Sequence, residues 1–319
     1  MRILDEVRGC RTIGIAGHIR PDGDAIGSCM GLALFLEKMM PDARIDVFGG
    51  HFDDALMRNI PGTEQINFTY QTDVESYDCF IALDCEKERL DQAEAFFDAA
   101  KKTINIDHHE SHKGSGDVNF IEPYASSTCE LVYLVIDREQ MDEKIAQALY
   151  VGMITDSGIF RFSNTSKRTM EIAGDLMSFG IPFSAICRDV YFAKTYRQQQ
   201  LMGRALVESI RLMDGKVIVS VFTRKIMDFY EATSYDLDGI SSQLVLTEGV
   251  DVAIFMHEVE PMTFKVSMRS KGAVNVAKVC QKFGGGGHAQ AAGCTVNQEW
   301  RDIVNNMTQE IERIMEPQQ

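Results

Sequence analysis

The first 110 residues alternate short apolar runs with segments of helical periodicity. The apolar runs have the length of buried strands and lie at residues 12–16, 45–48, 79–83 and 103–106. Between them, residues 25–40 and 87–100 carry apolar side chains at helical spacing. Strands that alternate with helices pair in parallel, and the connecting helices cover both faces of the sheet. The sequence therefore predicts an α/β domain built on a parallel sheet.

The polar residues that follow these strands are of the types that bind metal ions. In a parallel sheet the ligand site lies beyond the carboxyl ends of the strands, so we expect these side chains to converge on one crevice. They comprise His18, Asp22, Asp24, Asp84, Asp107, His108 and His109.

The spacing His18-x3-Asp22-x-Asp24 suits a pair of divalent ions, because each carboxylate can face a different ion. Two ions about 3.5–4 Å apart, bridged by a carboxylate, are the usual arrangement for in-line displacement at phosphorus. Carboxylates and imidazoles without a thiolate favour Mn²⁺, with Mg²⁺, Fe²⁺ or Co²⁺ as alternatives. The structural alternatives are a turn at Asp22, a buried histidine at His18 and a cap of helix 25–40 at Asp24. The predicted ligand set is completed by Asp84, His108 and Asp156.

Asp107, His108 and His109 form a continuous group at the end of the fourth predicted strand. His108 and His109 can divide two tasks, one binding a metal and the other donating a proton. Asp107 would then orient an imidazole from behind, as metal-bound histidines usually require. The alternative is a polar surface turn, since Glu110 and His112 follow directly.

A glycine-rich segment near the C-terminus is the second candidate for ligand binding. Its backbone N–H groups can form an anion-binding nest. We expect residues 289–292 to start a helix, where a phosphate also binds well. Arg269 and Lys271 would supply positive charge; a flexible linker is the alternative. The segment contains Gly285, Gly286, Gly287 and His288.

Two further segments carry side chains that suit a nucleotide. Residues 161–166 offer hydrogen-bond donors to a substrate, but capping of the helix from residue 167 explains them equally well. Tyr191, Phe192 and Tyr196 would stack on a base, although packing within a connector is the simpler use.

The charge balance excludes one class of partner. The formal net charge is −15, whereas proteins that grip long nucleic acids are usually basic. We therefore expect no long duplex DNA as a ligand, while a small phosphorylated molecule needs only a local positive cluster.

No apolar run is long enough for a membrane span, and the first residues lack the apolar core of a signal peptide. The eight cysteines form no CxxC pair, so we expect buried thiols in a reducing compartment. Together these features predict a cytoplasmic protein. We place the catalytic domain at residues 1–182, a helical connector at 183–212 and a smaller α/β domain at 213–319.

The motifs resemble those of a known family. Residues 18–28, Leu83-Asp84, Asp107-His108-His109 and residues 155–158 are similar to the four motifs of the DHH phosphoesterases. The glycine-rich segment resembles the DHHA1 domain that follows them in that family. The length and the form of residues 284–293 resemble the nanoRNase/pAp phosphatases.

The resemblance implies a role for each residue. His18, Asp22 and Asp84 would bind one metal ion, while Asp24, Asp84, His108 and Asp156 would bind the other. His109 would lie beside the scissile phosphate as an acid or electrostatic stabiliser. His288 and Arg269 would bind the substrate phosphate or base, and the active site would lie in the cleft between the domains. Cys85, beside Asp84, has no predicted role.

The resemblance also implies an activity, namely degradation of short RNA oligonucleotides to mononucleotides and dephosphorylation of 3′-phosphoadenosine 5′-phosphate (pAp) to AMP. Hydrolysis of cyclic or linear dinucleotides such as c-di-AMP or pApA is the alternative. A family II pyrophosphatase is disfavoured, because its C-terminal domain lacks such a glycine-rich segment. A regulatory nucleotide-binding module would need a lost metal ligand, and none is lost. The sequence leaves the oligomeric state open, a homodimer included.

Overall fold

A computed structural model describes residues 1–110 and 112–315 of the chain. The chain divides into two compact units, Met1–Ala193 and Lys194–Gln319. The division falls inside the connector predicted at residues 183–212, and the exact domain limits stay a prediction.

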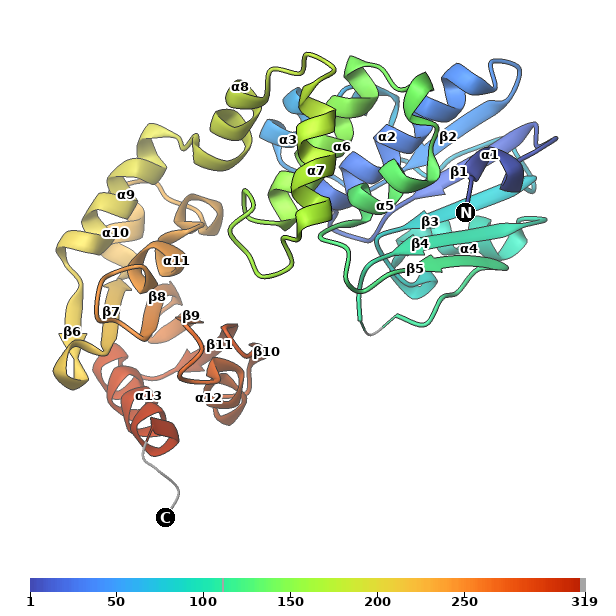
Figure 1. Ribbon diagram of the computed structural model, residues 1–319. Helices are drawn as coiled ribbons and strands as arrows, with labels where there is room; N and C mark the ends of the chain where they lie inside the picture. Colours follow the sequence, from blue (N-terminus) through green and yellow to red (C-terminus); the bar gives the residue numbers. More distant parts are fainter. Residues whose placement is uncertain (111, 316–319) are drawn as a thin grey trace. The chain divides into compact units, whose positions relative to one another are not determined.

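The first unit is built on a five-stranded parallel sheet of order β2-β1-β3-β4-β5 (Figure 1). The predicted parallel α/β domain is confirmed. The chain order reverses at β1, whose neighbours are β2 and β3, and ligands of open α/β sheets bind at such a reversal. The strands are β1 (Thr12–Ala16), β2 (Arg44–Phe48), β3 (Cys79–Leu83), β4 (Thr103–Asp107) and β5 (Val118–Ile121).

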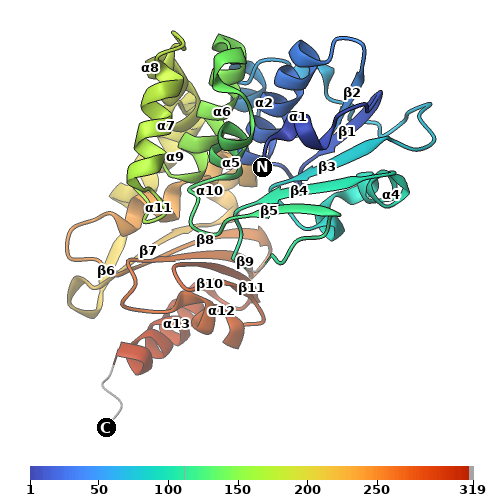
Figure 2. The same cartoon turned by 45° about the vertical axis from the view of Figure 1, so that its right-hand side comes forward.

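Helices cover both faces of this sheet, as predicted (Figure 2). Successive side chains of a strand point to opposite faces. Ile81 of β3 therefore packs into the larger core, and Phe80 into a smaller aromatic one on the other face. The larger core contains α2 (Gly23–Met39), α5 (Thr128–Val135), α6 (Glu143–Asp156) and α7 (Lys167–Met177), and the smaller one contains α4 (Glu94–Ala99).

The helix predicted at residues 87–100 is shorter than expected. Only α4 is α-helical there, preceded by two 3₁₀ turns at Lys87–Arg89 and Asp91–Ala93. Asp91 has a φ of 57°, a left-handed conformation that interrupts a right-handed helix. The remaining helices of this unit are α1 (Ile3–Glu6), α3 (Asp54–Asn59) and α8 (Phe183–Cys187), which runs into a π-helix at Arg188–Phe192.

The second unit has a six-stranded mixed sheet of order β10-β11-β9-β8-β7-β6. One face packs on α12 and α13 and the other on α9, α10 and α11, each through its own core. The smaller α/β domain is confirmed. The elements are α9 (Tyr196–Val207), β6 (Ile210–Leu212), β7 (Val217–Phe222), α10 (Arg224–Phe229), α11 (Ile240–Val245), β8 (Val252–Glu260), β9 (Thr263–Ser270), α12 (Val276–Lys282), β10 (Gly286–His288), β11 (Ala291–Asn297) and α13 (Trp300–Met315).

The helix start predicted at residues 289–292 is wrong. The glycine-rich segment is a β-hairpin, in which Gly287 pairs with Ala292 and His288 with Ala291. Gly287 has a φ of 139°, and a Cβ atom there would lie 2.5 Å from the carbonyl oxygen of Ala291. The glycine is therefore required by the close approach of two strands. Among the described residues, no helix is long and apolar enough to cross a membrane.

Candidate metal centre

Asp84 lies at the middle of the site, directly after β3. It is buried, and its φ of 63° is a left-handed conformation that aspartate tolerates better than most residues. Its Oδ2 lies 3.5 Å from Nε2 of His18, and its Oδ1 lies 3.5 Å from Nε2 of His108. The two oxygens of one carboxylate thus face two different imidazoles.

The first group of donor atoms comes from His18, Asp22 and Asp84, whose ligand atoms all lie within 4.8 Å of one another. Nδ1 of His18 donates to the carbonyl of Ile19 at 2.9 Å, which fixes the ring. Its Nε2 is thereby directed to Asp22, whose Oδ1 is 3.8 Å away.

Asp22, and not Asp24, caps helix α2. The Asp22 carboxylate accepts hydrogen bonds from the backbone N–H groups of Asp24 and Ala25. The cap predicted at Asp24 is wrong because the helix already begins at Gly23. The shift places Asp24 in the first turn, where its carboxylate points inward and is buried.

The second group comprises Asp24, His108 and Asp156, with ligand atoms again within 4.8 Å of one another. Nε2 of His108 lies 3.8 Å from Asp24 Oδ2 and 3.7 Å from Asp156 Oδ2. Asp156 ends helix α6, which packs closely on α2 and α5. A Cβ atom at Gly152 of α6 would lie 2.2 Å from Sγ of Cys129 and 3.1 Å from Cα of Asp24, so a glycine is needed where these helices approach.

The start of helix α5 holds these carboxylates, a contact that the sequence analysis missed. The backbone N–H groups of Thr128 and Cys129 donate to Asp24 at 2.6 and 2.9 Å. The Thr128 hydroxyl donates to Asp84 Oδ1 at 3.0 Å. These residues lie more than 40 positions away in sequence, and only the serine cap of the helix at residue 127 gave a local signal.

The loop before α5 is held in turn by Glu130. Its side chain is fully buried and accepts hydrogen bonds from the Ser126 hydroxyl, the Thr169 hydroxyl and Nε of Arg168. Arg168 also donates to Glu122, nearer the surface. A buried carboxylate with several donors orders the backbone that presents Thr128 to the centre.

We predict that Glu130→Ala lowers the free energy of unfolding by about 3–5 kcal/mol, because it leaves Arg168 and two hydroxyls without their buried acceptor. Glu122→Ala removes a partly exposed carboxylate from the same arginine and should cost at most about 1 kcal/mol. Urea unfolding of both variants measures the difference. Equal effects would contradict the role given to Glu130.

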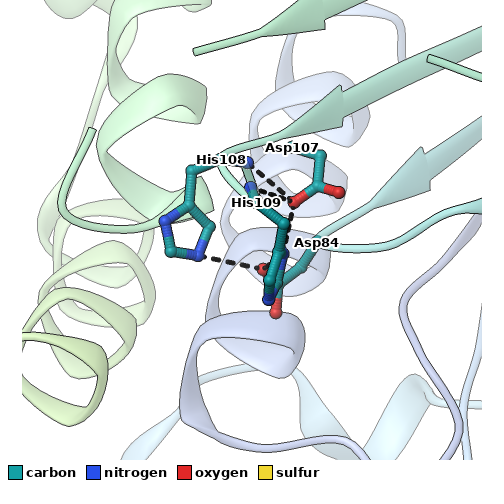
Figure 3. Close-up of side chains that lie close together, drawn as sticks. All are labelled: Asp84, Asp107, His108 and His109. Atoms are coloured by element: carbon teal, nitrogen blue, oxygen red, sulfur yellow. Dashed lines mark hydrogen bonds and ion pairs between the residues drawn. The ribbon is translucent and has the colours of Figure 1, made fainter. Parts of the chain in front are cut away.

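Asp107 contacts the imidazole ring of His109 and not that of the proposed ligand His108 (Figure 3). Asp107 Oδ1 accepts from the backbone N–H groups of both histidines, and it lies 2.7 Å from Nδ1 of His109. The His108 ring is fixed separately, because its Nδ1 donates to the carbonyl of Ala125 at 3.3 Å. The predicted orienting function of Asp107 therefore concerns His109 in this geometry.

The clustered carboxylates of the centre favour binding of a cation. Burial and the neighbouring carboxylates raise the pKa of Asp24 and of Asp156 to about 7, and they raise the pKa of Asp84 as well. Ionised carboxylates this close repel one another, and a divalent cation between them would remove the repulsion. Oxygen and imidazole donors at these separations fit such an ion, so the cluster can hold metal.

The two outer imidazoles respond to the same charges. Burial opposes protonation of His18, but hydrogen bonds with Asp22 and Asp84 outweigh it and raise its pKa to about 10. The hydrogen bond with Asp107 raises the pKa of His109 to about 9. Without a metal ion, protons therefore partly balance the acidic cluster.

In the second unit, Arg269 and His288 lie in one row across the sheet. His288 pairs with Ala291 in the hairpin, and Ala291 pairs with Arg269 of β9. Directly opposed residues point to the same face of a sheet. The arginine and the exposed histidine therefore flank a small alanine on one face, while Gly285 and Gly286 lie at the start of the hairpin.

The remaining candidates have mostly structural contacts. Ser166 caps helix α7, and Arg161 donates to the Tyr191 hydroxyl at 2.5 Å. Asn164 donates to the carbonyl of Ser126 at 2.9 Å, beside the centre. The Cys85 side chain packs in the aromatic core behind Asp84, which accounts for a residue that the sequence left unexplained.

Comparison with known proteins identifies the class. The N-terminal domain of the DHH family matches residues 12–153, and the DHHA1 domain matches residues 214–316. The parallel sheet and the cluster residues up to His109 lie in the first match, Asp156 lies three residues beyond its end, and the glycine-rich hairpin lies in the second. The chain therefore carries the N-terminal domain of the DHH family followed by a DHHA1 domain.

Individual proteins are similar to this chain over most of its length. A protein of Thermus thermophilus, named bifunctional oligoribonuclease and PAP phosphatase NrnA, is 29% identical over 98% of this chain and 93% of its own. The cyclic-di-AMP phosphodiesterase PdeA of Listeria monocytogenes is 27% identical over 87% of this chain and 44% of its own. The crystal structure of an exopolyphosphatase-related protein from Bacteroides fragilis is 26% identical, with a TM-score of 0.86 over 98% of this chain and 95% of that one.

Proposed function

We propose that this chain is a two-metal phosphohydrolase that degrades short RNA oligonucleotides to mononucleotides and dephosphorylates pAp to AMP. The observation that carries the proposal is the division of the Asp84 carboxylate, whose two oxygens face His18 and His108 at 3.5 Å. A carboxylate placed in this way could serve as a ligand to both ions of a two-metal phosphohydrolase, whose chemistry suits phosphoryl transfer. The names of the full-length relatives support the substrate class.

The proposed ligands divide between two ions. His18, Asp22 and Asp84 would hold one, and Asp24, Asp84, His108 and Asp156 the other. The donor set contains no thiolate, which favours Mn²⁺ over softer ions. Bound divalent ions supply Lewis-acid activation of water and neutralise charge on the phosphoryl oxygens.

The protein's own contribution to the reaction comes from His109. Its Nδ1 is held by Asp107, and its side chain is 43% exposed, so Nε2 is available to a substrate. As the water oxygen bonds to phosphorus, the bond to the leaving sugar oxygen breaks and Nε2 gives that oxygen a proton. The proton that the water releases then restores the imidazole through solvent. Arg269 and His288 of the second unit would bind the substrate phosphate or base.

The test is turnover with Mn²⁺ of an RNA dinucleotide, pAp, linear pApA, cyclic di-AMP and pyrophosphate, measured side by side. Turnover of the RNA dinucleotide and pAp is the expected result. Preferential turnover of cyclic di-AMP would favour the alternative, which the Listeria relative's name suggests and the same donor residues would serve. Consumption of pyrophosphate alone would overturn the proposal.

Metal affinity should rise with pH. Asp24 and Asp156 have pKa values of about 7, and His18 has a pKa of about 10, so protons compete with metal ions at neutral pH. Each displaced proton contributes up to about tenfold in affinity per pH unit below its pKa. From about pH 6 to about pH 8, Mn²⁺ affinity should increase by at least about tenfold, measured by calorimetry in two buffers that also report proton release. A pH-independent affinity would contradict the ligand set.

A further inference from the structure

The Asp107 carboxylate is held between two imidazoles. Its Oδ1 accepts from Nδ1 of His109 at 2.7 Å, and its Oδ2 accepts from Nδ1 of His112 at 2.5 Å. Asp107 and His112 are almost completely buried, with side chains 1% and 2% exposed, whereas His109 is 43% exposed. The carboxylate therefore joins an interior imidazole to one at the surface of the centre.

His112 has one polar contact that explains its type. Its Nε2 is buried and has no hydrogen-bond partner among residues 1–110 and 112–315, an arrangement that costs free energy. Its backbone N–H donates to the carbonyl of His109 at 3.1 Å, so the chain folds back over Asp107. The hydrogen bond from Nδ1 to Asp107 is thus the use that the side chain has.

We propose that His112 is a positioning residue, which fixes one oxygen of Asp107 so that the other can hold His109 for proton donation. This inference rests on the proposed function. His109 is too exposed to be oriented by packing, so its ring direction depends on the Asp107 hydrogen bond. Without His112, all hydrogen bonds to Asp107 would fall on Oδ1, from the two backbone N–H groups and from Nδ1 of His109. With Oδ2 released, the carboxylate has more freedom to turn about its Cβ–Cγ bond, and the imidazole would turn with it.

The test compares His112→Phe, which keeps a flat ring without a donor, with His112→Asn, which restores an N–H group. Loss of such a supporting partner typically costs about 10–100-fold in activity. We expect His112→Phe to lower kcat on an RNA dinucleotide by about that factor, with KM and the Mn²⁺ concentration for half-activity unchanged. His112→Asn should recover most of the rate. His257→Phe, which removes another buried imidazole in the second unit, is the matched control and should leave the rate unchanged.

A substrate with a different leaving group distinguishes loss of the His109 orientation from a general loss of structure in His112→Phe. A sugar oxygen needs a proton as it leaves, whereas nitrophenolate does not. His112→Phe should therefore slow the RNA dinucleotide strongly and a nitrophenyl phosphodiester little. In a His109→Ala background, His112→Phe should have no further effect, because the two residues act as one unit. Equal losses on both substrates, or additive losses in the double variant, would overturn the inference.

Failure of the proposed function would give a different result. If the wild-type protein turned over neither phosphodiester, the proposed function would fail, and the positioning contact would be tested by NMR of the imidazole protons. The Nδ1 proton of His109 should be protected from exchange in the wild type and in His112→Asn, and exposed to it in His112→Phe. Persistence of that protected proton in His112→Phe would overturn the inference in either case.

Discussion

Asp84→Asn is expected to lower turnover by more than about 100-fold. Loss of a residue that only supports a metal ligand costs up to about 100-fold, and loss of a ligand shared by two ions should cost more. The change keeps the shape of the side chain but removes the charge that faces both His18 and His108. One substitution thus disturbs both proposed ions. Steady-state kinetics at saturating Mn²⁺ measure the loss.

The same variant should not unfold the protein. The pKa of Asp84 is raised, chiefly by burial, so its ionised form destabilises the metal-free fold at neutral pH. Without metal, Asp84→Asn should therefore be as stable as the wild type or more so. Asp46→Asn is the control, because Asp46 lies on β2 and pairs with Arg44 and Tyr77 away from the centre. Wild-type turnover in Asp84→Asn would refute the two-metal proposal.

Removal of divalent ions is the second large effect that we expect. Dialysis against a chelator should abolish turnover, and Mn²⁺ should restore it. At an ion concentration about 100 times the Kd, one bound ion stabilises the fold by about 2.7 kcal/mol. For a unit of this size that corresponds to a rise in Tm of about 5–10 °C.

Thermal unfolding with and without Mn²⁺ measures the shift. Asp84→Asn should lose most of it, whereas Glu122→Ala should keep it, because Glu122 lies outside the donor groups. Turnover that persists in the chelated protein, or a Tm that does not respond to Mn²⁺, would contradict a resident metal centre.

The sequence predicted the sheet and the convergence of the donors for a simple reason. Hydrophobic periodicity fixes the type of each element, and a parallel sheet brings the ends of its strands to one edge. The residues after β1, β3 and β4 therefore met as expected. Only the position of Asp156, at the end of a helix, depended on how α6 packs against α2.

What the sequence did not predict depended on local backbone geometry or on distant contacts. Capping moved from Asp24 to Asp22 because the helix begins earlier than its apolar pattern indicates. The glycine-rich hairpin has few side chains, so no periodicity could distinguish it from a helix start. The contacts of Thr128 and Glu130 depend on where the start of α5 packs in the fold, and the contact of His112 depends on the course of a loop. Sequence pattern gives no signal for either.

The spread of the donors along the chain has a consequence for synthesis on the ribosome. His18 and Asp22 follow β1 and Asp84 follows β3, whereas Asp156 closes α6, the helix that packs against α2. A growing chain that has not yet reached residue 156 can assemble the first donor group but not the second. Metal loading of the second group would therefore mark the moment at which α6 has emerged and packed against α2, before α7 and α8 complete the unit.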